Sequence, residues 1–323
     1  MDITEKLQLI KYPILLKPFC REFIWGGTKL ISDYNKKYEG KTLSETWEIS
    51  VNDDFPSIID NGEYKGLALA ELIVDYPEIL GKQQTEFTLL IKFIDSAKTL
   101  SVQVHPDDAY AFANEGELGK TEAWYILDCV EGAYIYLGFK EKITIKQYEE
   151  YIMEGNIDKY LNKIFVKKGD SFVVEAGTVH SIGAGITLLE IQENSSITYR
   201  AYDYKRVDVN GKERDLHIDK ALAVTNLNAI DIQAYPQFDT YIHGRKVKVI
   251  AMCNYFTSYL VEGGLSFGFE EPTLINIIEG KGCVISKGES IDVEKGDSVF
   301  VIAGLSCRIM GSVKFILTIE GDK

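Results

Sequence analysis

Residues 168–180 read KGDSFVVEAGTVH, and residues 295–307 read KGDSVFVIAGLSC. The two stretches align without a gap. In each of them Gly-Asp predicts a turn, the following apolar run predicts a buried strand, and Ala-Gly predicts a second turn. The chain therefore contains two copies of one β unit. His180 in the first copy aligns with Cys307 in the second, so we expect the first copy to carry function and the second to serve packing.

The rest of the chain also has the character of a β protein. Many short strand-like runs are separated by Gly, Asn and Asp turns, which favours a sandwich or barrel with helical additions over alternating βαβ units. Thr144 and Gln147 form a capping box ahead of an amphipathic run that Gly155 interrupts. Helices are predicted over residues 67–74, 107–115, 145–161 and 216–224, and a linker over residues 233–243.

A second informative segment is LSVQVH, residues 100–105. Strict alternation places Ser101, Gln103 and His105 on one side of a strand. Alternate residues are roughly 6.6 Å apart along a strand, so the Gln103 amide oxygen and a His105 ring nitrogen can reach one metal ion. By itself a Gln-x-His pair is more often a surface or hydrogen-bonded feature. Its interpretation depends on further ligands from other segments.

Two other predicted strands supply such ligands. Residues 120–127, KTEAWYIL, place Lys120 and Glu122 on the same face, and the strand of residues 171–175 leads through a tight turn to His180. Three segments thus offer imidazole, carboxylate and imidazole, with a carboxamide alongside. This donor set contains no thiolate, and it suits a catalytic divalent ion with an open position better than a closed structural zinc site.

Composition sets limits on the function. With 323 residues, 46% hydrophobic and 26% charged, the chain is expected to be a globular protein of about two domains. The formal net charge of −14 argues against nucleic acids and anionic membranes as partners. No apolar run approaches the roughly 18 residues that span a bilayer, and residues 1–6 lack the organisation of a signal peptide. We therefore expect a cytoplasmic protein.

The motifs together resemble a known family. The turn–strand–turn pattern resembles the cupin double-stranded β-helix, a jelly-roll barrel that holds a metal in its mouth. Four ordered motifs are similar to type I mannose-6-phosphate isomerases in their short bacterial form: LSVQVHPDD (100–108), GKTEAWY (119–125), EAGTVHSI (175–182) and LLEIQENSSITYRAYDY (188–204). The resemblance implies a mainly β fold with two cupin barrels, a metal-binding catalytic domain over residues 1–232, and a C-terminal domain without metal ligands over residues 233–323.

The resemblance also implies the chemistry. It assigns one zinc ion per chain to four ligands, Gln103, His105, Glu122 and His180. The implied reaction interconverts mannose 6-phosphate and fructose 6-phosphate through an enediol, so the expected partner is a small sugar phosphate. The chain itself is expected to be a monomer or a homodimer.

Three further residues receive roles in this prediction. The family's catalytic arginine falls on Arg200, which would stabilise charge on the substrate oxygens; without the resemblance, a solvent-facing arginine in a surface ion pair is equally compatible with the pattern. Ser101 and Lys120 are predicted to bind substrate, and their shared faces with the metal ligands suggest a contact to the phosphate. The sequence does not identify the general base.

Because of three departures from the family pattern, the general base assigned in longer members is not carried over to this chain, and two alternative functions are considered. The large helical insertion of longer members is absent, Gly119 replaces a histidine found in some members, and the positions shortly before the arginine hold no carboxylate. A cupin dioxygenase could use two histidines and a carboxylate around iron, although Gln103 and the nearby cations argue against it. A regulatory protein that binds a sugar phosphate without turning it over is the other alternative.

Overall fold

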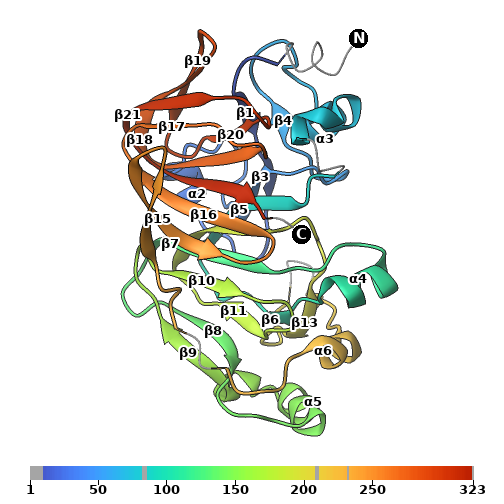
Figure 1. Ribbon diagram of the computed structural model, residues 1–323. Helices are drawn as coiled ribbons and strands as arrows, with labels where there is room; N and C mark the ends of the chain where they lie inside the picture. The colour runs from blue at the N-terminus through green and yellow to red at the C-terminus, as the bar shows by residue number, and fades with distance from the viewer. Residues whose placement is uncertain (1–9, 82–85, 208–210, 231–232, 322–323) are drawn as a thin grey trace.

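The computed structural model describes residues 10–81, 86–207, 211–230 and 233–321, and most of its strands belong to three antiparallel sheets (Figure 1). The central sheet has six strands in the order β10 (Ser171–Val174), β7 (Glu122–Cys129), β12 (Ile186–Glu193), β5 (Leu89–Ser96), β3 (Glu45–Ile49) and β2 (Phe19–Arg21). The short sheet has the order β13 (Tyr199–Tyr202), β6 (Val102–Val104), β11 (His180–Ile182), β8 (Tyr134–Phe139) and β9 (Leu161–Phe165).

The third sheet, here called the C-terminal sheet, has ten strands. Its main path is β14 (Phe238–Ile242), β15 (Arg245–Met252), β16 (Phe256–Glu262), β21 (Cys307–Glu320), β18 (Thr273–Ser286), β20 (Ser298–Val301), β1 (Ile14–Lys17) and β4 (Ile58–Ile59). Strand β17 (Leu265–Phe267) pairs with β21, and β19 (Glu289–Glu294) pairs with β18. The expected mainly β, cupin-like fold with helical additions is confirmed.

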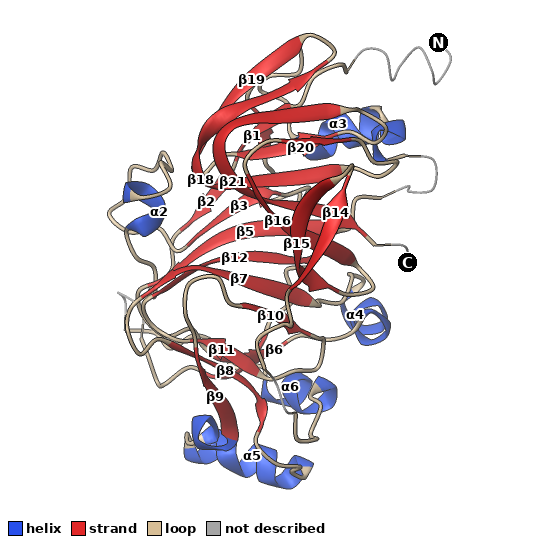
Figure 2. Ribbon diagram, turned by 60° about the vertical axis from the view of Figure 1, so that its left-hand side comes forward, coloured by secondary structure: helices blue, strands red, loops and turns tan. Residues whose placement is uncertain are grey.

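The helices connect or flank these sheets, as Figure 2 shows. They are α2 (Lys29–Ser32), α3 (Leu69–Asp75), α4 (Asp108–Glu115), α5 (Ile145–Glu154) and α6 (Ile218–Val224), with two 3₁₀ turns, η1 (Pro77–Leu80) and η2 (Ile157–Tyr160). The predicted capping box is present: the Thr144 hydroxyl accepts from the Gln147 backbone N–H at 3.2 Å, and the Gln147 side chain accepts from the Thr144 backbone N–H at 2.9 Å. Gly155 ends α5 with φ at 69°, a left-handed conformation that glycine adopts at little cost.

The central sheet is buried on both faces, and this explains why β5 and β12 have no exposed residue. Leu89, Ile91 and Phe93 pack with the C-terminal sheet, whereas Ile94 packs with residues of the short sheet. Because side chains alternate along a strand, Lys92 is placed on the side of Ile94. Polar side chains of the central sheet, such as Lys92, therefore face the space between the central and short sheets, and we look for the functional site there.

The structure bears on the predicted linker and on the predicted domain boundary. The linker predicted over residues 233–243 is wrong in part, because β14 pairs with β15 at the edge of the C-terminal sheet; its mostly exposed side chains give it the composition of a loop. The boundary predicted at residue 232 lies outside the described residues. Strands β1 and β4 belong to the C-terminal sheet, where β1 pairs with β20. Residues of the predicted first domain thus pair with residues of the predicted second domain, and the division into two domains stays a prediction.

No helix in the described ranges is long and apolar enough to cross a membrane.

Candidate active site

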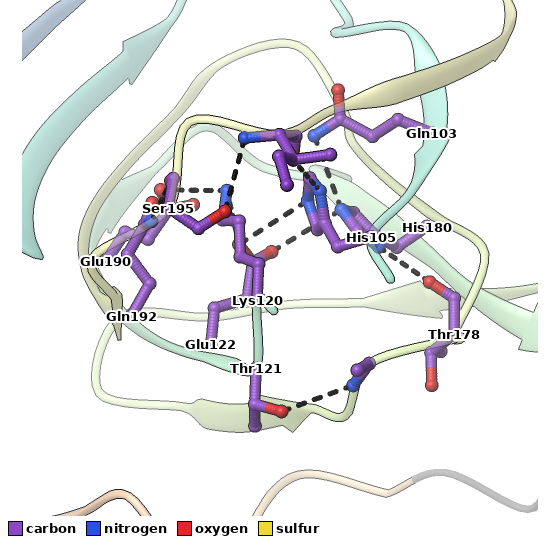
Figure 3. A network of polar contacts seen from close by, with 12 residues as sticks. Gln103, His105, Lys120, Thr121, Glu122, Thr178, His180, Glu190, Gln192 and Ser195 are labelled. Carbon is purple, nitrogen blue, oxygen red and sulfur yellow. Dashed lines mark hydrogen bonds and ion pairs between the residues drawn. The ribbon is translucent and has the colours of Figure 1, made fainter. Parts of the chain in front are cut away.

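Three strands bring the predicted imidazole, carboxylate and imidazole together (Figure 3). Glu122 is the first residue of β7, His180 is the first residue of β11, and His105 directly follows β6. All three side chains are buried, and one ligand atom from each lies within 4.8 Å of the others. The residues that the sequence proposed as metal ligands from separate segments therefore form one cluster, here called the His–Glu–His cluster.

Hydrogen bonds to backbone carbonyls orient both imidazoles. His105 Nδ1 lies 2.8 Å from the Ile197 carbonyl oxygen, and His180 Nδ1 lies 2.8 Å from the Thr178 carbonyl oxygen. A carbonyl only accepts, so each Nδ1 carries the proton and each Nε2 presents its lone pair to Glu122. The Nε2 atoms lie 3.7 Å (His105) and 3.4 Å (His180) from the nearer carboxylate oxygens.

Burial also sets the charge of the two imidazoles. It is the largest influence on both, and it lowers the pKa of His180 below its usual value and that of His105 well below it. Both rings are therefore neutral at pH 7, which is the form that binds metal ions.

The cluster contains buried polar atoms whose bonding is incomplete. His105 Nε2 and Glu122 Oε1 make no hydrogen bond within the described part of the chain. An unsatisfied buried polar group costs about 1–3 kcal/mol, and a cation between these atoms removes that cost. Two imidazoles and a carboxylate without a thiolate are ligands of catalytic divalent ions. The residues present therefore fit a metal ion.

Gln103 lies at the edge of the cluster. Its Nε2 is 3.3 Å from His180 Nε2, and its Oε1 accepts from the Ser101 hydroxyl at 3.3 Å. In this orientation the amide nitrogen faces the cluster. A half-turn of the amide would bring the oxygen, the atom that ligates metals, to the same place. The role of Gln103 as a fourth ligand stays a prediction.

Lys120 lies against the carboxylate side of the cluster. Its Nζ is 2.8 Å from Glu122 Oε2 and 3.7 Å from Glu190 Oε1, and the residue is 4% exposed. Burial lowers the pKa of this ammonium, but the two carboxylates more than compensate and hold it above its ordinary value. Lys120 is therefore a fixed positive charge beside the cluster.

A cavity of about 300 Å³ adjoins the cluster through Gln103 and Lys120, which line it together with two other predicted site residues, Ser101 and Arg200. Arg200 lies in β13 opposite Gln103 of β6. One of its terminal nitrogens donates to the Asp215 carbonyl at 2.7 Å, while its Nε is buried without a hydrogen-bond partner among the described residues. A larger groove of about 920 Å³ contains none of the predicted site residues.

The sequence analysis missed Glu190 and Lys92, which face each other across β12 and β5 on the cavity wall. Glu190 Oε1 lies 3.2 Å from Lys92 Nζ, and its other oxygen accepts from the Trp124 indole N–H at 3.2 Å. The signal was the alternation of Glu190 and Gln192 inside an apolar run. The family pattern led us to expect a carboxylate immediately before Arg200, and none is present there. The fold instead brings Glu190, from further back in the chain, to the same cavity as Arg200.

This mainly β, cupin-like fold with a buried His–Glu–His cluster beside a cationic cavity is the architecture of a cupin-type enzyme. Residues 14–125 match the family described as phosphomannose isomerase type I, catalytic domain. The chain is 38% identical over 303 residues to mannose-6-phosphate isomerase ManA of Bacillus subtilis, covering 91% of this chain and 94% of that protein.

Two further comparisons agree. The mannose-6-phosphate isomerase of Streptococcus mutans is 36% identical over 293 residues, covering 90% of this chain and 92% of that protein. The crystal structure of the mannose 6-phosphate isomerase from Bacillus subtilis superposes with a TM-score of 0.88 at 35% identity, covering 95% of this chain and 99% of that chain. The chain belongs to the type I phosphomannose isomerase family.

Proposed function

We propose that this protein is a mannose-6-phosphate isomerase, which reversibly converts mannose 6-phosphate into fructose 6-phosphate at a single zinc site. The observation that carries the proposal is the His–Glu–His cluster, whose incompletely bonded atoms lie next to Gln103 and Lys120 in the wall of a cationic cavity. His105, Glu122 and His180 would hold the metal, with Gln103 as the fourth ligand. A bound zinc ion would supply a Lewis acid that polarises the substrate oxygens.

Glu190 is our candidate for the proton transfer that the isomerisation requires. The reaction moves a proton between C2 and C1 of the sugar through an enediol, so a base must lie within hydrogen-bond reach of both carbons. Glu190 lines the cavity next to Lys120 and is not part of the His–Glu–His cluster. Burial raises the pKa of this carboxyl, but Lys120 and Lys92 more than compensate and hold it below its ordinary value. The carboxylate is therefore ionised at pH 7, which is the state that a general base requires.

Arg200 is our candidate for stabilising the charge that develops on the substrate oxygens. Its guanidinium borders the cavity across from Gln103, and its buried Nε has a free N–H to donate within the described structure. Removing one such preorganised donor commonly lowers turnover about 10²–10³-fold. Ser101 and Lys120 would contact the sugar beside the metal end of the cavity, where their polar atoms already lie.

The test is turnover of mannose 6-phosphate by the purified protein before and after chelation, with zinc, manganese, cobalt and iron added back separately. We expect activity that chelation abolishes and that zinc restores. Folded protein that shows no turnover with any metal, but binds sugar phosphates saturably, would contradict the proposal and favour the regulatory protein. Full activity without oxygen would exclude the dioxygenase alternative.

A further inference from the structure

The cations that line the active-site cavity differ in how their charges are balanced. Four of them, Arg21, Lys92, Lys120 and Arg214, have a carboxylate partner within 4.0 Å. The side chain of Arg200 donates only to a backbone carbonyl and has no ion-pair partner within the described ranges. Burial, and next to it the nearby charge of Arg214, lowers the pKa of Arg200. Arg200 and Arg214 both line the cavity, and their like charges act on each other.

Asp203 fixes the position of the second guanidinium. Arg214 donates from Nε to one carboxylate oxygen of Asp203 at 2.7 Å and from Nη2 to the other at 2.5 Å. Arg206 donates to the same carboxylate, which is only 3% exposed. The single negative charge of Asp203 is thus shared by the guanidiniums of Arg206 and Arg214, and the three side chains together carry a net positive charge. Arg214 lines the cavity whereas Arg206 does not, and the Nη1 of Arg214 has no hydrogen-bond partner in the part of the chain that is described.

We propose that Arg214 binds the phosphate group of the sugar phosphate, while Arg200 keeps its role at the reacting oxygens, and that Asp203 is a positioning residue that holds Arg214 at the cavity wall. The inference rests on the proposed function and extends it to the recognition of the phosphate. A phosphate monoester carries close to two negative charges and offers several acceptor oxygens. A guanidinium whose one edge is fixed by a carboxylate keeps its remaining N–H groups oriented for such a ligand.

The charge distribution favours a phosphate beside Arg214 over one beside the His–Glu–His cluster. Lys120 lies between the carboxylates of Glu122 and Glu190, so a phosphate there would meet two negative charges at close range. The sequence suggested that Ser101 and Lys120 contact the phosphate, whereas the charge distribution favours Arg214 for that contact. Under the present assignment these two residues contact the sugar near the metal.

The first experiment compares steady-state kinetics of the variant R214Q with the matched control R206Q. Both arginines bind Asp203, but only Arg214 reaches the cavity. We expect R214Q to raise KM for mannose 6-phosphate roughly 10- to 100-fold, the range for losing a charge-assisted hydrogen bond, with kcat changed less than about threefold. R206Q should leave KM within about twofold of the wild-type value. A KM that rises equally in both variants would overturn the inference.

Two further variants separate a binding role from a structural one. R214K keeps the charge but loses the planar fork, so its KM should lie between those of the wild type and R214Q. D203N should raise KM less than R214Q does, with kcat retained, because Arg214 stays present but is less firmly held. A fall in kcat in D203N without a change in KM would contradict its positioning role.

The second experiment measures binding of inorganic phosphate to the chelated protein by calorimetry, which requires no turnover. Weaker binding to R214Q than to R206Q supports the inference even if the wild type fails to isomerise mannose 6-phosphate, a result that would refute only the proposed function. Equal phosphate affinity of the wild type and R214Q, or no phosphate binding by the wild type, overturns the inference.

Discussion

Strands β10 and β20 occupy equivalent places in the two copies of the repeated unit, and the turn before each is closed by the same hydrogen bond. Asp170 accepts from the Lys167 backbone N–H at 2.9 Å, and Asp297 accepts from the Glu294 backbone N–H at 2.8 Å. The local backbone design is thus shared. It follows that this β unit folds without requiring any particular residue at the end of the repeat.

The ends of the two copies differ in chemistry. His180 in the first copy turns its Nε2 toward Glu122 in a polar cluster, whereas Cys307 in the second copy lies in β21 opposite Phe267 and packs in the apolar core. Burial raises the pKa of the Cys307 thiol to about 11, so it stays a neutral, inert group. The same scaffold position therefore holds a residue of the His–Glu–His cluster in one copy and an apolar core residue in the other.

The largest effect is expected from replacing His180, the cluster residue of the first copy. H180A removes one imidazole from the cluster, so we expect loss of metal binding and at least a 100-fold fall in turnover, beyond the roughly 10–100-fold effect of residues that only support a ligand. Metal content by atomic absorption and isomerase assay measure it. The matched control C307A should keep full activity and metal content; loss of metal in C307A would contradict the division of roles.

The next largest effect is expected on the cavity wall. E190Q keeps the size of the side chain and removes its basicity, so we expect kcat to fall roughly 10²–10⁴-fold, the usual contribution of a general base. Metal content should remain at the wild-type level because Glu190 is not in the His–Glu–His cluster. Turnover within about threefold of the wild type would show that another group moves the proton.

A smaller effect, on stability rather than chemistry, is expected in the second copy. Phe300 of β20 is fully buried, and its ring centroid lies 5.6 Å from the ring centroid of Phe87. F300A should lower the free energy of unfolding by about 3–5 kcal/mol. Urea unfolding measures this change. Below the transition the variant should keep the wild-type kcat, and a selective loss of kcat in the folded state would contradict a packing role.

The smallest effect concerns the turn of the second copy. Burial, as the largest influence, raises the pKa of the Asp297 carboxyl above its ordinary value. A raised carboxyl pKa contributes stability that is present below the unfolded-state value of about 4 and is lost as the pH rises through the folded-state value. D297N can keep the turn hydrogen bond through its amide oxygen and does not ionise.

Stability measurements from pH 4 to pH 7 test this expectation. The stability of D297N relative to the wild type should rise with pH, by less than about 1 kcal/mol because the carboxyl is partly exposed to solvent. A relative stability that falls with pH would contradict the sign.

The sequence predicted the parts of the site that depend on local patterns. Alternation in residues 100–105 and 120–127 placed Gln103 and His105, and then Lys120 and Glu122, on common strand faces, and the structure brings His105 and Glu122 together with His180. The parts that were missed come from pairings between distant strands. Glu190 faces Lys92 because β12 pairs with β5, and no local pattern reveals that partner.

What the sequence by itself determined is the class of the fold, the repeat, the capping box of α5 and the three residues of the His–Glu–His cluster. Strand alternation, turns and caps are set by interactions between residues close in the chain. Only the tertiary structure decided that the central sheet is buried on both faces, that β1 joins the C-terminal sheet, and that Asp203 holds Arg214 at the cavity. These features depend on burial and charge balance among segments far apart in sequence, and such interactions exist only once the sheets have packed.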